Sequence, residues 1–318
     1  MPRTSLLSPW PSARRVLVTG SEGLVGRALC RSLERRGWET VGLDLRGAGS
    51  ERGDVRTPHR VRDAIAGCGG VVHLAAVSRV IWAERAPADC REVNVGGVRR
   101  VLEAALEATP RPWVLFASSR EVYGRSRRLP VAEGAPLSPV NVYGRSKVAG
   151  ERLVDGARTN GLKAATVRLS NVYGSTSDHA DRVVPAFARA AAEGSAIRID
   201  GAGCTFDFTH IDDAVRGLVA VIDRLEGGKT PPLVHLLTGT PTTLRELAAL
   251  AVSLAGCAVP ISEAPPRAFD VAHFHGDPSR AREVLGWEPR IPLREGLARL
   301  VRDFRAEIES VAPAQAAP

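Results

Sequence analysis

A tyrosine and a lysine spaced four residues apart are the side chains in this sequence best suited to proton transfer. Tyr143 and Lys147 begin a segment that continues with helix-forming residues at 148–154. The i,i+4 spacing therefore places the phenol and the ammonium on one face of a helix. A phenol has a pKa near ~10 in water and is a poor base at neutral pH. An adjacent ammonium favours the phenolate, so we expect a tyrosine pKa lowered toward the working range.

The tripeptide Val-Tyr-Gly occurs three times, and the three tyrosines differ in the residues on their C-terminal side. Tyr123 has an arginine at the fourth position, but Pro130 comes soon after, so we expect this segment to be a loop without helical geometry. Tyr173 has Ser177 at the fourth position and therefore no cation. Tyr143 is the tyrosine that we expect to transfer protons.

A glycine-rich turn, with Gly20, Gly23 and Gly26, lies between a predicted strand and a predicted helix. The first glycine permits a tight turn, the second allows the backbone to approach a pyrophosphate, and the third lets the helix pack on the strand. The N-terminus of the helix then directs unpaired N–H groups at the phosphates. Asp44 closes the next strand, where a carboxylate binds the adenosine ribose and repels a 2′-phosphate. This pattern predicts NAD rather than NADP, although Arg46 could contact a phosphate.

Strands and helices alternate over the first half of the chain. β-Branched or continuously apolar runs predict strands at 15–19, 39–43, 70–76, 112–117 and 164–169. Periodic or capped segments predict helices at 24–36, 61–66, 87–109 and 143–159. The alternation predicts an α/β fold with a doubly wound parallel sheet of the Rossmann type.

The alternation ends after Gly174. We expect extended segments at 197–199, 206–211 and 233–237. Helices are expected at 182–193, 243–255, 278–285 and 293–308, and the one at 243–255 begins with a capping box. A further helix is expected to begin after Asp212, which would be its N-cap. This organisation predicts an NAD-binding domain at 14–174 with return segments at 205–240. A smaller α/β substrate-binding domain takes 175–204 and 241–310, between disordered ends at 1–13 and 311–318.

Composition favours a cytoplasmic protein that acts on small molecules. The net charge is +8 and aromatic residues make up 5% of the chain, without the interleaving of cations and rings that nucleic-acid binding needs. No apolar run approaches the ~20 residues of a membrane span. Five cysteines without CxxC spacing predict reduced thiols. His273, His275 and Asp277 lack further ligand spacing, so we expect no metal site.

The motifs together resemble the extended short-chain dehydrogenase/reductase superfamily, and within it the NAD-dependent nucleotide-sugar epimerase/dehydratase branch. The resemblance runs from about residue 14 to residue 304. Its motifs are the glycine turn, Asp44, the segments 71–76, 118–124 and 168–174, the Tyr143-x-x-x-Lys147 pair, and the tail segments 285–289 and 293–296.

The resemblance implies roles for individual positions. Lys147 would hold the nicotinamide ribose and tune Tyr143, while Asp54 and Val55 would contact the adenine. The expected cofactor contacts are Gly20, Gly23, Leu24, Val25, Gly26, Asp44, Asp54, Val55, Leu74, Ala75, Ala76, Asn94, Ser118, Tyr143 and Lys147. Ser119 would hydrogen-bond the reacting sugar oxygen, whose proton Tyr143 would move. The expected substrate contacts are Ser78, Arg79, Ser119, Asn171, Val184, Phe206 and Arg267, with Asn171 and Arg267 at the diphosphate.

The branch implies oxidation of a sugar hydroxyl, usually at C4, to a ketone that is then reduced again. We therefore expect a nucleotide-sugar epimerase, and a homodimer. Related dehydratases carry an Asp-Glu pair after the catalytic Ser or Thr, where this chain has Arg120 and Glu121. The alternative enzyme is a UDP-uronic acid decarboxylase or a nucleotide-sugar dehydratase. Arg120 argues against dehydration, whereas Glu121 is compatible with decarboxylation and is a further candidate catalytic residue. A non-catalytic dinucleotide sensor is the alternative from another class; it predicts loss of the Ser-Tyr-Lys set, which this chain retains.

One position departs from the family pattern at the diphosphate. The expected Arg-Asp-Phe sequence appears here as Phe206-Asp207-Phe208. A neutral ring cannot form the paired hydrogen bonds that a guanidinium makes to phosphate. Another arginine must compensate, or the substrate carries less phosphate. Arg79 is a candidate for this, and it could also contact a uronic carboxylate.

Overall fold

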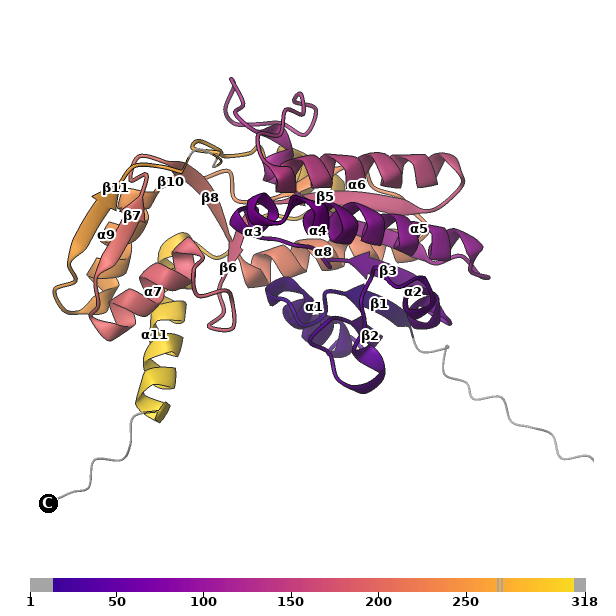
Figure 1. Ribbon diagram of the computed structural model, residues 1–318, viewed down its shortest axis with the longest axis horizontal. Helices are drawn as coiled ribbons and strands as arrows, with labels where there is room; N and C mark the ends of the chain where they lie inside the picture. Colours follow the sequence, from indigo (N-terminus) through magenta and orange to yellow (C-terminus); the bar gives the residue numbers. More distant parts are fainter. Residues whose placement is uncertain (1–13, 268, 270, 312–318) are drawn as a thin grey trace, which may run out of the picture.

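The computed structural model describes residues 14–267, 269 and 271–311. Its centre is a six-stranded parallel sheet in the order β2-β1-β3-β4-β5-β9 (Figure 1). The strands are β1 (Arg15–Thr19), β2 (Glu39–Leu43), β3 (Gly70–His73), β4 (Trp113–Ser119), β5 (Ala164–Leu169) and β9 (Val234–Leu236). The order of the strands reverses at β1, which confirms the predicted doubly wound α/β fold. In such sheets, ligands bind at the carboxyl ends of the strands beside this reversal.

Helices cover both faces of the sheet, as expected for parallel strands that are buried on both faces. On one face lie α1 (Leu24–Glu34), α8 (Ile211–Glu226) and α10 (Ser279–Leu285). On the other lie α2 (Pro58–Ile65), α5 (Gly97–Glu107) and α6 (Val142–Thr159).

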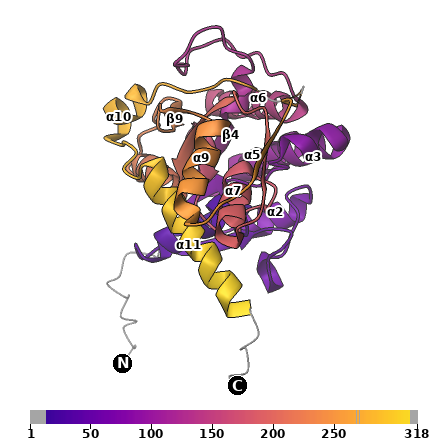
Figure 2. The same cartoon turned by 90° about the vertical axis from the view of Figure 1, so that its left-hand side faces the viewer.

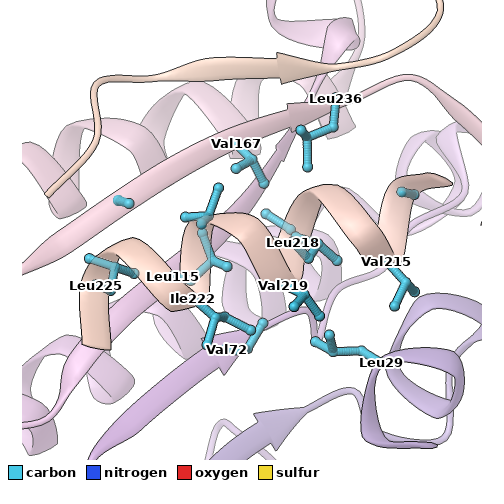
Figure 3. Packing of buried hydrophobic residues seen from close by; sticks show 14 of the residues in the cluster. Leu29, Val72, Leu115, Val167, Val215, Leu218, Val219, Ile222, Leu225 and Leu236 are labelled. Carbon is cyan, nitrogen blue, oxygen red and sulfur yellow. The ribbon is translucent and has the colours of Figure 1, made fainter. Parts of the chain in front are cut away.

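Alternation of side chains along each strand divides the core into two clusters. Val16 and Val18 of β1 pack with the α1 and α8 face, whereas Leu17 packs on the opposite face. Figure 3 shows α8 against the sheet, where Leu218 and Ile222 lie among side chains of several strands. Burial on both faces makes the carboxyl edge of the sheet a rigid support for the site.

A third core forms a C-terminal lobe, which we define by the helices α7 (Val183–Glu193), α9 (Leu244–Ala255) and α11 (Leu293–Val311). These helices pack with β7 (Ile197–Asp200), which pairs with β11 (Ile261–Ala264). A three-stranded sheet contains β10 (Pro241–Thr243), β8 (Thr205–His210) and β6 (Asn171–Tyr173). Figure 2 views the molecule from the side of this lobe, with α11 in yellow. The division of the chain into an NAD-binding and a substrate-binding domain stays a prediction.

Several elements differ from the sequence expectations. The expected helix 87–109 is α4 (Pro87–Arg91), a π-helical stretch η2 (Glu92–Gly96) and α5. Helix α3 (Val80–Arg85), the 3-10 turns η1 (Gly49–Glu51) and η3 (Arg120–Tyr123), and the short strands β6, β10 and β11 were not expected, because segments this short carry no clear periodicity.

Asp212 is not the cap of α8, contrary to the expectation. The His210 ring nitrogen accepts a hydrogen bond from the Asp212 backbone N–H, so His210 is the N-cap. A histidine was overlooked because Ser, Thr, Asp and Asn are the usual capping residues. Asp212 lies in the first turn instead, where its charge is favourable near the helix N-terminus.

Candidate active site

A cleft of about 540 Å³ opens at the carboxyl ends of the central strands. The sequence-predicted cofactor residues that line it are Gly20, Gly23, Leu24, Val25, Gly26, Asp44, Asp54, Val55, Leu74, Ala75, Ala76, Ser118, Tyr143 and Lys147. The structure therefore brings together all of the predicted cofactor residues except Asn94.

The glycine turn has the geometry that a dinucleotide needs. Gly20 has a φ of +72°, and a Cβ there would lie 2.7 Å from the Ala75 backbone nitrogen. A Cβ on Gly26 would collide with the Gly20 carbonyl oxygen. Gly23 is the N-cap of α1, and no side chain caps this helix. The first N–H groups of α1 can therefore bind a phosphate, so the residues present fit NAD.

Asp44 lies at the far end of the same cleft, with its carboxylate fixed by the turn. Its oxygens accept hydrogen bonds from the backbone N–H groups of Glu22, at 3.1 Å, and of Arg46, at 2.9 Å. The Arg46 guanidinium donates to the Glu22 carbonyl at 2.7 Å and lies 3.6 Å from Asp44. Arg46 is thus folded back onto this turn and partly neutralises Asp44.

Asn94 does not line the cleft, in contrast to the other predicted cofactor residues. It is buried, and its amide bonds both the N–H of Val77, at 2.7 Å, and the carbonyl of Val77, at 3.2 Å. It also donates to Ser146 Oγ on α6 at 2.9 Å. Asn94 therefore holds the segment after β3 against α6, one layer behind the cleft.

Tyr143 and Lys147 lie on α6 and face the cofactor cleft, as their spacing predicts. The Lys147 Nζ lies 5.7 Å from the centre of the Tyr143 ring and donates a 2.8 Å hydrogen bond to the Ala117 carbonyl of β4. Because Asn141 caps the start of α6, the whole first turn of this helix is fixed.

Burial dominates the protonation of both groups. It raises the pKa of Tyr143 to about 12, although a hydrogen bond with Ser119 and the charge of Arg182 act in the opposite direction. Burial also lowers the pKa of Lys147 to about 8. The expected lowering of the tyrosine pKa by Lys147 is absent, because desolvation of the phenolate outweighs the favourable contacts.

A second cavity, of about 230 Å³, adjoins the cofactor cleft on the side of the C-terminal lobe. It is lined by all of the predicted substrate residues and by Glu121: Ser78, Arg79, Ser119, Glu121, Asn171, Val184, Phe206 and Arg267. Ser119 and Tyr143 line both cavities. A molecule in the second cavity can therefore reach Ser119, Tyr143 and the cofactor cleft together.

Glu121 is buried at the edge of this cavity, and both of its carboxylate oxygens are engaged. Oε1 pairs with Arg120 at 2.8 Å, and Oε2 accepts a 2.7 Å hydrogen bond from the Asn141 amide. The Glu121 carboxylate therefore joins Arg120 to Asn141.

Sequence reasoning missed two arginines of the site. Arg120 lines the substrate cavity, and Arg182 lines both cavities while pairing with Asp178 at 3.6 Å. Arg182 carries no motif, so its position could not be inferred. Arg120 comes directly after Ser119, and that adjacency was the one signal that could have identified it.

Tyr123 lines neither cavity, and Tyr173 lines the substrate cavity but not the cofactor cleft, so Tyr143 is the one of the three tyrosines that lines both. Tyr123 ends η3 and is almost fully buried, with its hydroxyl 2.5 Å from both His235 Nε2 and an Arg168 guanidinium nitrogen. Tyr173 packs edge-on against His210. The expected loop around Tyr123 is therefore partly wrong, since buried polar partners order it.

Neither a metal cluster nor a membrane-spanning helix is present among the described residues. No group of three or more His, Cys, Asp or Glu side chains in this part of the chain could hold a metal ion. No helix among the same residues has the length and apolar character to cross a membrane.

Relatives of known name share both the sequence and the fold. UDP-glucose 4-epimerase of Mycolicibacterium smegmatis is 33% identical, over 92% of this chain and 98% of the relative. UDP-glucuronate 4-epimerase 4 of Arabidopsis thaliana is 30% identical, over 90% of this chain and 74% of the relative. The structure of MoeE5 in complex with UDP-glucose and NAD has a TM-score of 0.84 at 29% identity and covers 92% of this chain and 99% of its own.

The family is also evident from the motifs as a set. Residues 16–236 match the family model described as the NAD dependent epimerase/dehydratase family. This span contains the glycine turn, Ser119, Tyr143 and Lys147, the residues on which the resemblance was based. The predicted resemblance is thus confirmed, and the chain belongs to the NAD-dependent epimerase/dehydratase family.

Proposed function

We propose that this protein is an NAD-dependent nucleotide-sugar epimerase that inverts C4 of the sugar through a transient 4-keto form. The observation that carries the proposal is the position of Ser119 and Tyr143, which line both the cofactor cleft and the substrate cavity. A sugar hydroxyl at this junction is within reach of a proton-transferring group and of the nicotinamide side of the cleft.

The residues around the cofactor cleft suit each part of NAD. The glycine turn and the uncapped start of α1 would hold the pyrophosphate, and Asp44 the adenosine ribose. Lys147, buried beside Tyr143, would hold the nicotinamide ribose. When bound, NAD supplies the acceptor that takes the hydrogen from C4 and gives it back.

Ser119 and Tyr143 would handle the proton of the C4 hydroxyl. With a pKa raised to about 12, Tyr143 holds its proton at neutral pH in the free protein. Removal of the sugar proton requires that the phenolate be stabilised, which is the contribution of the Ser119 hydrogen bond and of the nearby cations Arg182 and Lys147. Reprotonation of the 4-keto oxygen on return of the hydrogen uses the same groups in reverse.

The choice of epimerisation over its alternatives has two supports. Relatives that span most of this chain are named UDP-glucose 4-epimerase and UDP-glucuronate 4-epimerase. Arg120 stands where a dehydratase would have an acid, and Glu121, the acid on which a decarboxylase would depend, is held by Arg120 and Asn141. The intact Ser119-Tyr143-Lys147 set speaks against a non-catalytic sensor.

The test is incubation of the purified protein with UDP-, dTDP-, GDP- and CDP-sugars, and analysis of the products by NMR and mass spectrometry. An epimerase gives a C4-inverted product of unchanged mass from at least one of them. Loss of water or of carbon dioxide would identify a dehydratase or a decarboxylase instead. No product from any sugar, with NAD bound, would favour the sensor.

We infer further that the enzyme is a cytoplasmic homodimer that binds neither nucleic acid nor membranes. Arginine pairs without interleaved aromatic residues support the absence of nucleic-acid binding, and cysteines without CxxC spacing support reduced thiols of a cytoplasmic protein. The homodimer is what the family resemblance implies. Light scattering on the protein as it elutes from a size-exclusion column measures the oligomeric state directly. A monomer at the concentration used in the activity assay would contradict the dimer.

A further inference from the structure

Arg120 lines the substrate cavity without a role in the proposed chemistry. It comes directly after Ser119 and begins η3. Its side chain lines the substrate cavity but not the cofactor cleft, and the residue is only 6% exposed. A guanidinium this deeply buried needs partners for its N–H groups.

Three neighbours fix the Arg120 side chain in place. The guanidinium carbon lies 5.0 Å from the centre of the Phe206 ring and 5.4 Å from that of Phe274. Glu121 pairs with Nη2 at 2.8 Å. The cation is thus held against two aromatic rings and by one carboxylate, so it is ordered before any ligand binds.

The other terminal nitrogen of Arg120, Nη1, indicates that the side chain can bind a ligand. Nη1 of Arg120 is buried and has no hydrogen-bond partner among the described residues. Leaving such a donor without an acceptor is costly. A ligand oxygen in the cavity would remove that cost, and an anionic oxygen would do so most strongly.

The position of Arg120 indicates which group of the substrate would bind its Nη1. The reacting carbon must lie at the junction of the two cavities, where Ser119 and Tyr143 are. Arg120 lines the substrate cavity but not the cofactor cleft, as do Phe206 and Arg267. Phe206 occupies the position where the family pattern has its phosphate-binding arginine, so a cation packed on this ring points to the diphosphate.

We propose that Arg120 binds the diphosphate and supplies the cation that Phe206 cannot. This inference rests on the proposed function, since it requires a nucleotide-sugar substrate. Arg79, the candidate from sequence, resembles Arg120 in two respects: it pairs with a carboxylate, Asp181, at 2.7 Å, and its Nη1 is also buried without a hydrogen-bond partner among the described residues. What distinguishes Arg120 is that it packs directly on the Phe206 ring. A substrate carboxylate is the competing partner for Arg120, and the experiment distinguishes the two.

The test is titration of UDP, uridine and NAD⁺ into the parent protein and the variants Arg120→Gln and Arg120→Lys. Loss of a charged hydrogen bond weakens binding by about 10- to 100-fold. We expect that loss for UDP with Arg120→Gln and a smaller one with Arg120→Lys. Uridine lacks the diphosphate, and NAD⁺ occupies the other cleft, so their affinities should stay the same and show that the variants are folded. Arg128→Gln, which removes an exposed charge from the same segment, should change none of the three.

A second variant tests whether positions 120 and 206 are interchangeable. The double variant Arg120→Gln, Phe206→Arg removes the cation at position 120 and places one on β8 at position 206. Its UDP affinity should exceed that of Arg120→Gln by about 10-fold or more. Equal UDP affinity in the parent and Arg120→Gln overturns the proposal. UDP-glucuronate is titrated in parallel, and a loss of affinity confined to it also overturns the proposal, because it would mark Arg120 as a carboxylate ligand. A parent that epimerises no nucleotide-sugar would instead refute the proposed function, whatever the UDP result.

Discussion

Asn141 and Glu121 join the catalytic helix to the segment that carries Ser119. The Asn141 amide donates a 2.7 Å hydrogen bond to Glu121 Oε2, and its Oδ1 accepts a 2.7 Å hydrogen bond from the Gly144 N–H at the start of α6. The relative position of Ser119 and Tyr143, two residues after the cap, therefore depends on a buried carboxylate that need not take part in the chemistry.

Replacement of Glu121 should separate a supporting role from a catalytic one. Glu121→Gln keeps an oxygen for Asn141, so epimerisation should stay within about tenfold of the parent, with a product of unchanged mass. Glu121→Ala leaves Asn141 and Arg120 without their partner and should lower the free energy of unfolding by about 1–3 kcal/mol. Product analysis and denaturant titration check both, and a loss of turnover in Glu121→Gln as large as that in Tyr143→Phe would show direct participation.

Tyr143→Phe should affect turnover, whereas Tyr123→Phe should affect stability. Tyr143→Phe removes the proton-transferring hydroxyl and should lower kcat by ~10²–10⁴, with NAD still bound. Tyr123→Phe removes a hydroxyl that contacts His235 and Arg168, so it should destabilise the protein by about 1–3 kcal/mol and change kcat little. Steady-state kinetics and thermal unfolding of the pair decide this, and the opposite ranking of the two kcat values would mean that the site is misassigned.

The pH dependence should report on Lys147. Burial lowers its pKa to about 8, so the ammonium is present below that pH and is lost as the pH rises through it. In the proposed mechanism the ammonium helps to stabilise the Tyr143 phenolate when the sugar proton is removed, so kcat should decline above about pH 8. Lys147→Arg keeps a cation that does not titrate there and, though slower, should lose this alkaline decline. An unchanged profile in Lys147→Arg would assign the decline to another group.

Asp44 should control the choice of cofactor. Its carboxylate is fixed at the end of β2 by the Glu22 and Arg46 N–H groups, so a 2′-phosphate there meets a negative charge. The parent should prefer NAD over NADP, and Asp44→Ala should reduce that preference by about 10-fold or more, with Arg46 free to bind the phosphate. Asp63→Ala, an exposed acid on α2, serves as the control for charge alone. Tighter NADP binding by the parent would refute the role given to Asp44.

Much of the sheet and the cofactor cleft could be predicted because their signals are local. A strand buried on both faces is continuously apolar, as at 71–72 in β3, and a turn that needs φ > 0 beside a close backbone contact requires glycine, as at Gly20. The helical face shared by Tyr143 and Lys147 is evident from spacing alone.

The rest depends on contacts between distant parts of the chain. Spacing cannot show that Asn94 binds Val77 behind the cleft, or that Arg120 reaches the Phe206 ring on β8. The protonation of Tyr143 was misjudged for the same reason. Its pKa depends on how completely the fold removes water from the phenol, and the sequence contains that information only through the whole tertiary structure.

The central claim is that hydrogen leaves C4 of a nucleotide-sugar and returns to the same carbon within one site. The most direct measurement uses the nucleotide-sugar that the protein epimerises, labelled with deuterium at C4 and monitored by NMR and mass spectrometry during turnover by the NAD-loaded protein. The account predicts a C4-inverted product that keeps the deuterium at C4, with unchanged mass and no accumulation of NADH. Exchange of the label into solvent, a product of lower mass, or stoichiometric release of NADH would contradict it.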